Sequence, residues 1–109
     1  MKMVIAIVQD KDVGKLLQSV TREGLRATRL ASSGGFLRSG NTTLLFGVEE
    51  ERLDTLIAKI RETCQLREEM LTPAQSIMGP ADAHIPLPIE VPVGGATIFV
   101  LDVEQFIKV

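Results

Sequence analysis

Residues 25–48, LRATRLASSGGFLRSGNTTLLFGV, carry the pattern from which the fold is most readily inferred. Residues 25–31 alternate between two faces and predict a strand, with Arg26, Thr28 and Leu30 on one of them. Residues 32–41 are rich in glycine and serine and predict a loop. Residues 42–48, rich in Thr, Leu and Phe, predict a second strand. The stretch is therefore two strands joined by a loop long enough to suggest a functional role.

The residues before this stretch predict a strand and a helix. Residues 3–8 form a continuous apolar run, which is typical of a strand buried on both faces. A helix follows, with Asp10 or Asp12 as its N-cap and Gly24 as its left-handed stop. Its predicted buried stripe consists of Val13, Leu16, Leu17 and Val20.

The residues after it predict a second helix and a last strand. The acidic run 49–51 opens the helix, where carboxylates suit the positive end of the dipole. Residues 65–93 contain all five prolines, and residues 85–93 alternate apolar residues with proline or glutamate. This alternation predicts an extended ribbon that cannot pair centrally in a sheet, because proline lacks the donor. Residues 96–101 are the last predicted core strand. The predicted stripe of the second helix is Leu53, Leu56, Ile57, Ile60 and Cys64.

This order of elements predicts an α+β fold, a ferredoxin-like βαββαβ sandwich. The 109 residues suit one domain, 1–109, with an extended proline-rich loop before the last core strand. Two helices cover only one face of a four-stranded sheet, yet three of the strands are apolar on both faces. We therefore expect a homo-oligomer in which another subunit covers the second face.

Composition narrows the class of partner. A net charge of −2 and the absence of Trp and Tyr argue against nucleic acid polymers and acidic membranes as partners. Residues 22–41 contain four Arg and one Glu, a local charge of +3, which fits one small anion. The single cysteine allows no internal disulfide, and no segment is long enough to span a membrane, so we expect a cytoplasmic protein.

The polar residues of 26–47 form the candidate site. Arg26 and Thr28 share one side of a strand, where a guanidinium and a hydroxyl suit a phosphate; the alternative is a solvated sheet edge. Phe36 and Leu37 at the loop tip either stack on a base or pack on the protein itself. Asn41 either pairs with an adenine edge or serves as a turn residue.

Glycines of the same unit have local explanations as well. Gly34 and Gly35 permit close backbone approach and positive φ. A strand glycine such as Gly47 indicates either a bulge or a ligand that needs the space.

Catalysis is not expected. Residues 35–42 resemble a degenerate Walker A loop, but Asn41 replaces the lysine and a strand follows, which excludes ATP hydrolysis of that type. Cys64 lies on the helix stripe and is best explained as a core thiol. His84 is the sole histidine and has no clustered partner, so we expect no catalytic residues, metal or cofactor.

Four motifs resemble the PII-like cyclic di-AMP receptor proteins of Gram-positive bacteria, and residues 1–10 and 86–93 are similar too. The motifs are RATRLA at 26–31, GGFLR at 34–38, GNTT at 40–43 and VGGAT at 93–97. The resemblance covers essentially the whole chain and implies a PII-like homotrimer that binds cyclic di-AMP between subunits without catalysis. In that family, loop 32–41 corresponds to the T-loop and loop 66–92 to the B-loop, which is thought to change order on binding.

Carried over residue by residue, the resemblance implies that Arg26 and Thr28 hold phosphate. Phe36 and Leu37 would pack on an adenine, while Asn41 and the backbone of Gly47 would read an adenine edge. Further ligand contacts are expected at Gly35, Gly94, Arg38 and Thr42. The charge of Lys108, and not the resemblance, suggests a further contact with a phosphate. The chain departs from the family at Gly24, where Asn is frequent, at Ser32-Ser33, where Thr-Thr is usual, and at Lys108, where a Gln commonly reaches the ligand.

The leading hypothesis is a receptor that relays the level of cyclic di-AMP to an unidentified downstream protein through ordering of loops 32–41 and 65–93. Three alternatives stay open: a PII-like sensor of a mononucleotide such as ATP, a nucleotide-processing enzyme and a purely structural trimer. Ligand titration and ligand turnover separate these hypotheses.

Overall fold

The computed structural model describes residues 1–30, 40–71 and 88–109. Six elements form the body of the molecule in the order strand, helix, strand, strand, helix, strand, which confirms the predicted βαββαβ order. They are β1 (Lys2–Gln9), α1 (Asp10–Arg22), β2 (Ala27–Leu30), β3 (Asn41–Val48), α2 (Glu50–Cys64) and β6 (Ala96–Asp102). No helix in these ranges is long and apolar enough to cross a membrane.

The body is built on one four-stranded antiparallel sheet with the strand order β2-β3-β1-β6. The apolar strand β1 takes a central position, as its continuous hydrophobic run predicts. Val4 lies opposite Phe46 of β3 and Val100 of β6, and this register continues without a break to the pair Gln9 and Asn41.

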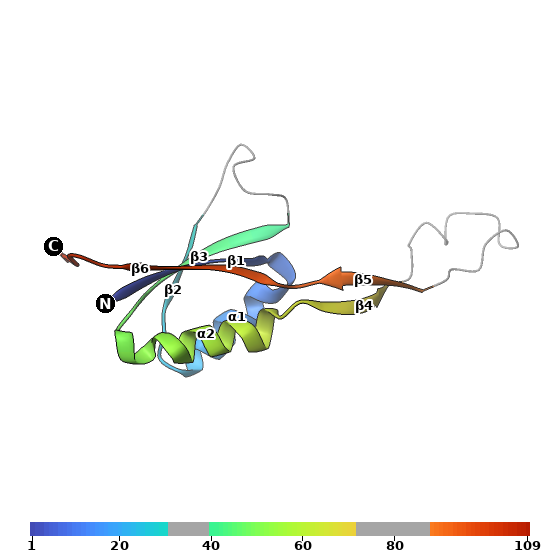
Figure 1. Cartoon of the computed structure of the whole chain (residues 1–109), viewed down its shortest axis with the longest axis horizontal. Coiled ribbons are helices and arrows are strands. Elements are labelled where there is room, and N and C mark those ends of the chain that lie inside the picture. Colours follow the sequence, from blue (N-terminus) through green and yellow to red (C-terminus); the bar gives the residue numbers. More distant parts are fainter. Residues whose placement is uncertain (31–39, 72–87) are drawn as a thin grey trace, which may run out of the picture.

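Both helices pack on the same face of this sheet (Figure 1). The predicted stripes of the helices are confirmed at their centres, because Val13, Leu16 and Val20 of α1 and Leu56, Ile60 and Cys64 of α2 are buried. Leu17 and Leu53 are partly buried against the same core. The sheet contributes Val4, Ala6, Val8, Leu44, Phe46 and Val48 to this core.

The other face of the sheet, here called the open face, is covered by no helix of the described chain (Figure 1). Its side chains come from alternate strand positions, namely Met3, Ile5, Ile7 and Gln9 of β1, Asn41, Thr43, Leu45 and Gly47 of β3, Thr28 and Leu30 of β2, and Thr97, Phe99 and Leu101 of β6. Phe99 is 51% exposed and Leu101 47% exposed. An apolar sheet face without a cover is what the sequence predicts for a single subunit.

The proline-rich region corrects one expectation. The extended loop expected over residues 66–92 contains two paired strands, because β5 (Ile89–Val93) pairs with β4 (Arg67–Leu71), a strand that the sequence pattern does not reveal. Residues 89–93 are extended and lie outside the central sheet, as their sequence predicts. Each strand of a two-stranded sheet keeps one unpaired side, so Pro92 is tolerated opposite Glu68. These two strands, here called the arm, extend from the body at the end away from both termini (Figure 1).

Three local predictions concern the bounds of β2, the N-cap of α1 and the conformation of Gly24. The strand predicted over 25–31 is β2, Ala27–Leu30, because Leu25 instead packs into the core; Ala31 lies outside the described residues. Neither Asp10 nor Asp12 caps α1, since both lie within its first turn and the N-cap position is Gln9. Gly24 does adopt the predicted left-handed conformation, with φ of 75°.

Candidate functional site

One end of the open face is polar. Gln9 ends β1 opposite Asn41, which begins β3, so the strand register places both side chains on the open face beside each other. A pocket of about 330 Å³ opens at this point, lined by Ile7, Gln9, Asn41, Gly94, Gly95, Ala96 and Thr97. Two residues expected from the sequence to bind ligand, Asn41 and Gly94, therefore line the same pocket.

Gly94 is required by the backbone and by its neighbours. Its φ is 86°, and a Cβ atom added there would clash with the backbone oxygen of Gln65 and lie 2.5 Å from Nη1 of Arg67. Its N–H donates to Oε1 of Gln9 at 2.6 Å. A larger residue would therefore disturb both the pocket wall and the root of the arm.

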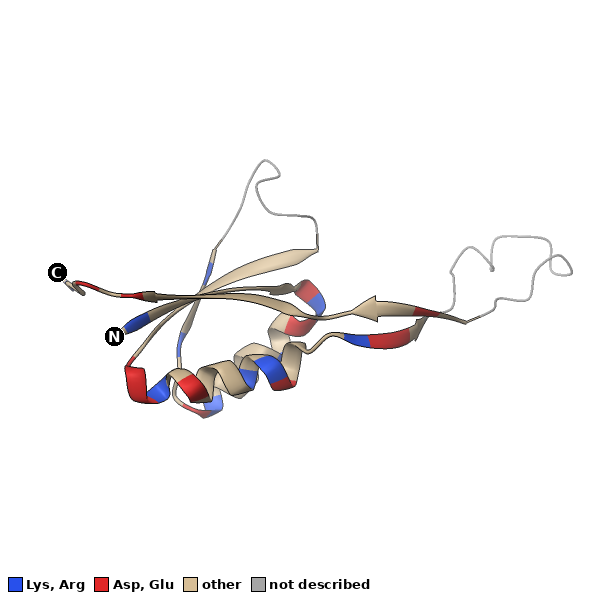
Figure 2. Ribbon diagram, in the orientation of Figure 1, with Lys and Arg blue, Asp and Glu red and all other residues tan. Residues whose placement is uncertain are grey.

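Arg26 and Thr28 lie at the β2 edge of the same sheet. Thr28 is exposed and paired with Leu45, which places it on the open face. Arg26 is exposed one residue before β2, and the alternation of the strand puts it on the side of Thr28. No ion pair between described residues engages Arg26. Figure 2 shows basic residues at β2, whereas β3 beside it carries no charge.

Gly47 is not forced by its surroundings. It lies in β3 opposite Met3, in unbroken register, so the bulge considered from the sequence is not present. A Cβ atom added to Gly47 meets no other atom within 4 Å. The glycine thus leaves open space on the face that carries Thr28.

Of the other residues expected to bind ligand, Thr42 and Lys108 lie within the described part of the chain and four do not. Thr42 lies on the helix-covered side of β3, opposite Val8, and its hydroxyl donates to Oδ1 of Asp10. Lys108 is exposed in the segment after β6. Gly35, Phe36, Leu37 and Arg38 lie outside the described residues.

Sequence reasoning missed three residues on the open face. Gln9 carries no diagnostic motif, and only the strand register brings it to Asn41. Thr43 is 5% exposed, and its hydroxyl has no hydrogen-bond partner among the described residues, a condition that costs about 1–3 kcal/mol in a protein interior. Phe99 presents an exposed aromatic ring in the strand row of Leu45 and Ile5, a position that the alternation of residues 96–101 could have indicated.

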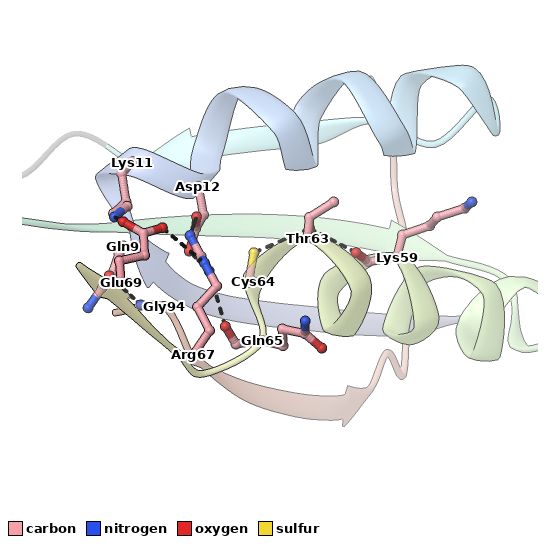
Figure 3. A network of polar contacts seen from close by, with 10 residues as sticks. All are labelled: Gln9, Lys11, Asp12, Lys59, Thr63, Cys64, Gln65, Arg67, Glu69 and Gly94. Carbon is pink, nitrogen blue, oxygen red and sulfur yellow. Dashed lines mark hydrogen bonds and ion pairs between the residues drawn. The ribbon is translucent and has the colours of Figure 1, made fainter. Parts of the chain in front are cut away.

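A polar network joins this site to the arm, as Figure 3 shows. Nη2 of Arg67 donates to Oδ1 of Asp12 at 2.7 Å, and Nζ of Lys11 donates to Oε2 of Glu69 at 2.7 Å. The hydrogen bond to Asp12 raises the pKa of Arg67, and the bond from Lys11 lowers the pKa of Glu69. The network therefore holds β4 against the start of α1.

Cys64 lies at the edge of this network and is fully buried, which confirms the expected core thiol. Burial raises the pKa of this thiol, so it stays protonated at neutral pH. Cys64 is therefore unsuited to act as a nucleophile.

Comparisons with known proteins agree with the sequence motifs. The family model described as "Cyclic-di-AMP receptor" matches residues 1–109. A solved structure, "The crystal structure of a functionally unknown protein from Pediococcus pentosaceus ATCC 25745", is 44% identical in sequence and superposes with a TM-score of 0.77. The match covers 99% of this chain and 96% of the Pediococcus pentosaceus chain.

Proposed function

This chain belongs to the cyclic-di-AMP receptor family, and from that premise we propose that it is a non-catalytic receptor that binds cyclic di-AMP on the open face. The observation that carries the proposal is the pocket shared by Asn41 and Gly94, two residues from distant segments that the sequence motifs had already marked as ligand contacts. Arg26 and Thr28 on the same face supply donors for a phosphate.

In this proposal, Asn41 reads an adenine edge, since its amide offers both a donor and an acceptor. The space left by Gly47 admits the ligand close to the strand backbone. The buried hydroxyl of Thr43, two residues from Asn41, gains a partner when a polar ligand atom is bound. Phe36 and Leu37 would add packing against an adenine, as the family resemblance implies.

We further propose a homotrimer with the ligand between subunits. The support is the exposed apolar surface of a single chain, which includes Met3, Phe99 and Leu101 on the open face. Phe106 and Ile107 in the segment after β6 are 68% and 74% exposed. Surfaces of this kind are normally covered by another subunit. The choice of three subunits comes from the family resemblance.

The proposed output is a change in the arm that a downstream protein recognises. The arm adjoins the pocket directly, since Gly94 follows the last residue of β5. A ligand that contacts Gly94 can therefore favour one arrangement of the arm. We place the receptor in the cytoplasm, a reducing compartment in which the single free thiol of Cys64 is expected to persist.

Calorimetric titration of the size-fractionated oligomer with cyclic di-AMP and with ATP tests this proposal. We expect saturable heat with cyclic di-AMP and a much weaker response to ATP. Saturation by ATP alone would instead favour the mononucleotide sensor, and absence of heat with cyclic di-AMP at micromolar protein would contradict the proposal. Chromatography of the ligand after long incubation should recover it intact, whereas turnover would indicate an enzyme.

A further inference from the structure

Four consecutive residues, the last of β1 and the first three of α1, hold the two chain segments that border the pocket. This segment, Gln9–Asp12, is here called the junction. Each junction residue makes a polar contact with a distant part of the chain. The contacts are Gln9 with Gly94, Asp10 with Gly40 and Thr42, Lys11 with Glu69, and Asp12 with Arg67.

The first two junction residues fix both walls of the pocket. The backbone N–H of Asp10 donates to the carbonyl of Gly40 at 2.8 Å, and the carboxylate of Asp10 accepts from the Thr42 hydroxyl. Asn41 is therefore held from both sides by one residue. Gln9 holds the opposite wall through Gly94, at 2.6 Å.

The last two junction residues fix the arm. Lys11 and Asp12 contact Glu69 and Arg67, both in β4. The Asp12 side chain is 2% exposed, so its carboxylate depends on Arg67 for charge compensation. A two-stranded ribbon is only marginally stable by itself. The orientation of the arm therefore depends strongly on these contacts.

Gly94 lies next to both ends of the junction, because it is bonded to Gln9 and lies close to Arg67, the partner of Asp12. A Cβ atom added to Gly94 would clash with the backbone oxygen of Gln65 and lie 2.5 Å from Nη1 of Arg67, so Gly94 lies against both residues. A displacement of Gly94 at the pocket wall therefore reaches both the Gln9 amide and the Arg67–Asp12 pair. Because Oε1 of Gln9 accepts from Gly94, its Nε2 group remains as a donor in the pocket lining.

We propose that Gln9 is a positioning residue of the nucleotide site and that the junction transmits occupancy of the pocket to the arm. This inference rests on the proposed function, since it requires a ligand between Asn41 and Gly94. A bound ligand changes the arm only if its contacts differ between two arrangements of the arm. In this proposal, the Gln9–Gly94 bond and the adjacent Arg67–Asp12 pair are the contacts that change between the two arrangements.

The test compares hydrogen exchange of β4 and β5 amides with and without cyclic di-AMP, in the full chain. Gln9→Ala removes the acceptor for Gly94. Asp12→Asn with Arg67→Gln removes both charges of the pair without leaving one of them buried alone. The matched control is Glu23→Gln with Lys59→Gln, an ion pair of 3.7 Å that lies away from the junction. Thermal melts establish that each variant folds, and calorimetry measures its affinity.

In the parent chain and the control we expect cyclic di-AMP to slow exchange in both the start of β3 and the arm, by about tenfold in the arm. In the two junction variants the protection at the start of β3 should persist, while protection of the arm is lost. Gln9→Ala should also weaken binding by about tenfold, because a positioned wall of the site is lost.

Protection of the arm that equals the parent's in both junction variants would overturn the inference. If the double variant does not fold, Gln9→Ala alone tests the inference. This variant should fold, because it only truncates a half-buried side chain at the end of a strand. Absence of cyclic di-AMP binding to the parent chain is a different result, which contradicts the proposed function itself.

Discussion

The Asp12 carboxylate accepts hydrogen bonds from both terminal nitrogens of Arg67, a residue 55 positions away in the sequence. Nη2 donates to Oδ1 at 2.7 Å, and Nη1 donates to Oδ2 at 3.4 Å. This forked geometry is the strong form of an arginine–carboxylate pair. It fastens the arm to the first turn of α1. The pair therefore makes the stability of the body and the position of the arm depend on each other.

Removal of Arg67 should lower the melting temperature more than removal of the whole pair. Arg67→Leu leaves the Asp12 carboxylate buried without its partner, whereas Asp12→Leu with Arg67→Leu removes both charges. Differential scanning calorimetry of the two variants makes the comparison. A double variant that melts below Arg67→Leu would contradict this account of the pair.

Gly94→Ala should destabilise the fold, and Gly47→Ala should not. At Gly94 a side chain would have to adopt a φ of 86° and would clash with the backbone oxygen of Gln65 and with the Arg67 guanidinium, so we expect a loss of about 1–3 kcal/mol. At Gly47 a methyl group enters open space, so the stability should change by less than about 0.5 kcal/mol while ligand affinity falls. Urea unfolding measures both, and equal losses would show that the close approach at Gly94 is unimportant.

The Lys11–Glu69 pair should contribute to stability above about pH 4.5 and lose that contribution in acid. Lys11 lowers the pKa of Glu69 below its ordinary value of 4.5, so the unfolded chain binds the proton first as the pH falls. Stability is therefore lost as the pH falls through the folded-state pKa. Melting temperatures between about pH 2 and 6 should fall less steeply for Lys11→Met than for the parent.

Asp102 provides the internal reference for that measurement. Its pKa is also lowered, by the hydrogen bond from Lys2, and this contribution is the same in parent and Lys11→Met. The variant should therefore retain part of the acid sensitivity. Identical pH profiles for the two proteins would show that the Lys11–Glu69 pair does not contribute to folding.

Phe99→Asp should prevent formation of the proposed trimer while leaving the subunit folded. Phe99 is 51% exposed on the open face, so a carboxylate there disturbs the proposed interface and not the core. Leu66→Asp is the control, because Leu66 is 72% exposed in the connection between α2 and β4. Sedimentation equilibrium should give trimer mass for the parent and Leu66→Asp and monomer mass for Phe99→Asp. Trimer mass for all three would exclude Phe99 from the interface.

The body of the fold could be predicted from local patterns. The apolar run of β1 and the stripes of the two helices depend on nearby residues, and the structure confirms them. β4 could not be predicted from the sequence, because its residues Arg67, Glu68 and Glu69 do not alternate with apolar residues. Two of those charges are compensated by Lys11 and Asp12, and a sequence pattern does not reveal partners so far apart.

Contacts between residues far apart in the sequence also explain why Gln9 and the role of Asp12 were not predicted. Asn41 and Gly94 were marked by motifs, whereas Gln9 becomes significant only when strand pairing sets it opposite Asn41 and within 2.6 Å of Gly94. The sequence predicts Asp10 or Asp12 as the helix cap, because aspartate is among the preferred N-cap residues. The partner of Asp12, 55 residues away, gives this residue another role.

The proposed cyclic di-AMP site on the open face can be tested by calorimetric titration of cyclic di-AMP into the parent, Arg26→Ala and Arg29→Ala. Arg26 lies on the side of Thr28, whereas Arg29 pairs with Leu44 and belongs to the other face of the same short strand. We predict that Arg26→Ala weakens binding by about tenfold or more, since a charge-assisted bond to phosphate is lost, while Arg29→Ala binds as the parent does. Equal affinity of all three proteins, or no binding by the parent, would contradict a cyclic di-AMP site on the open face.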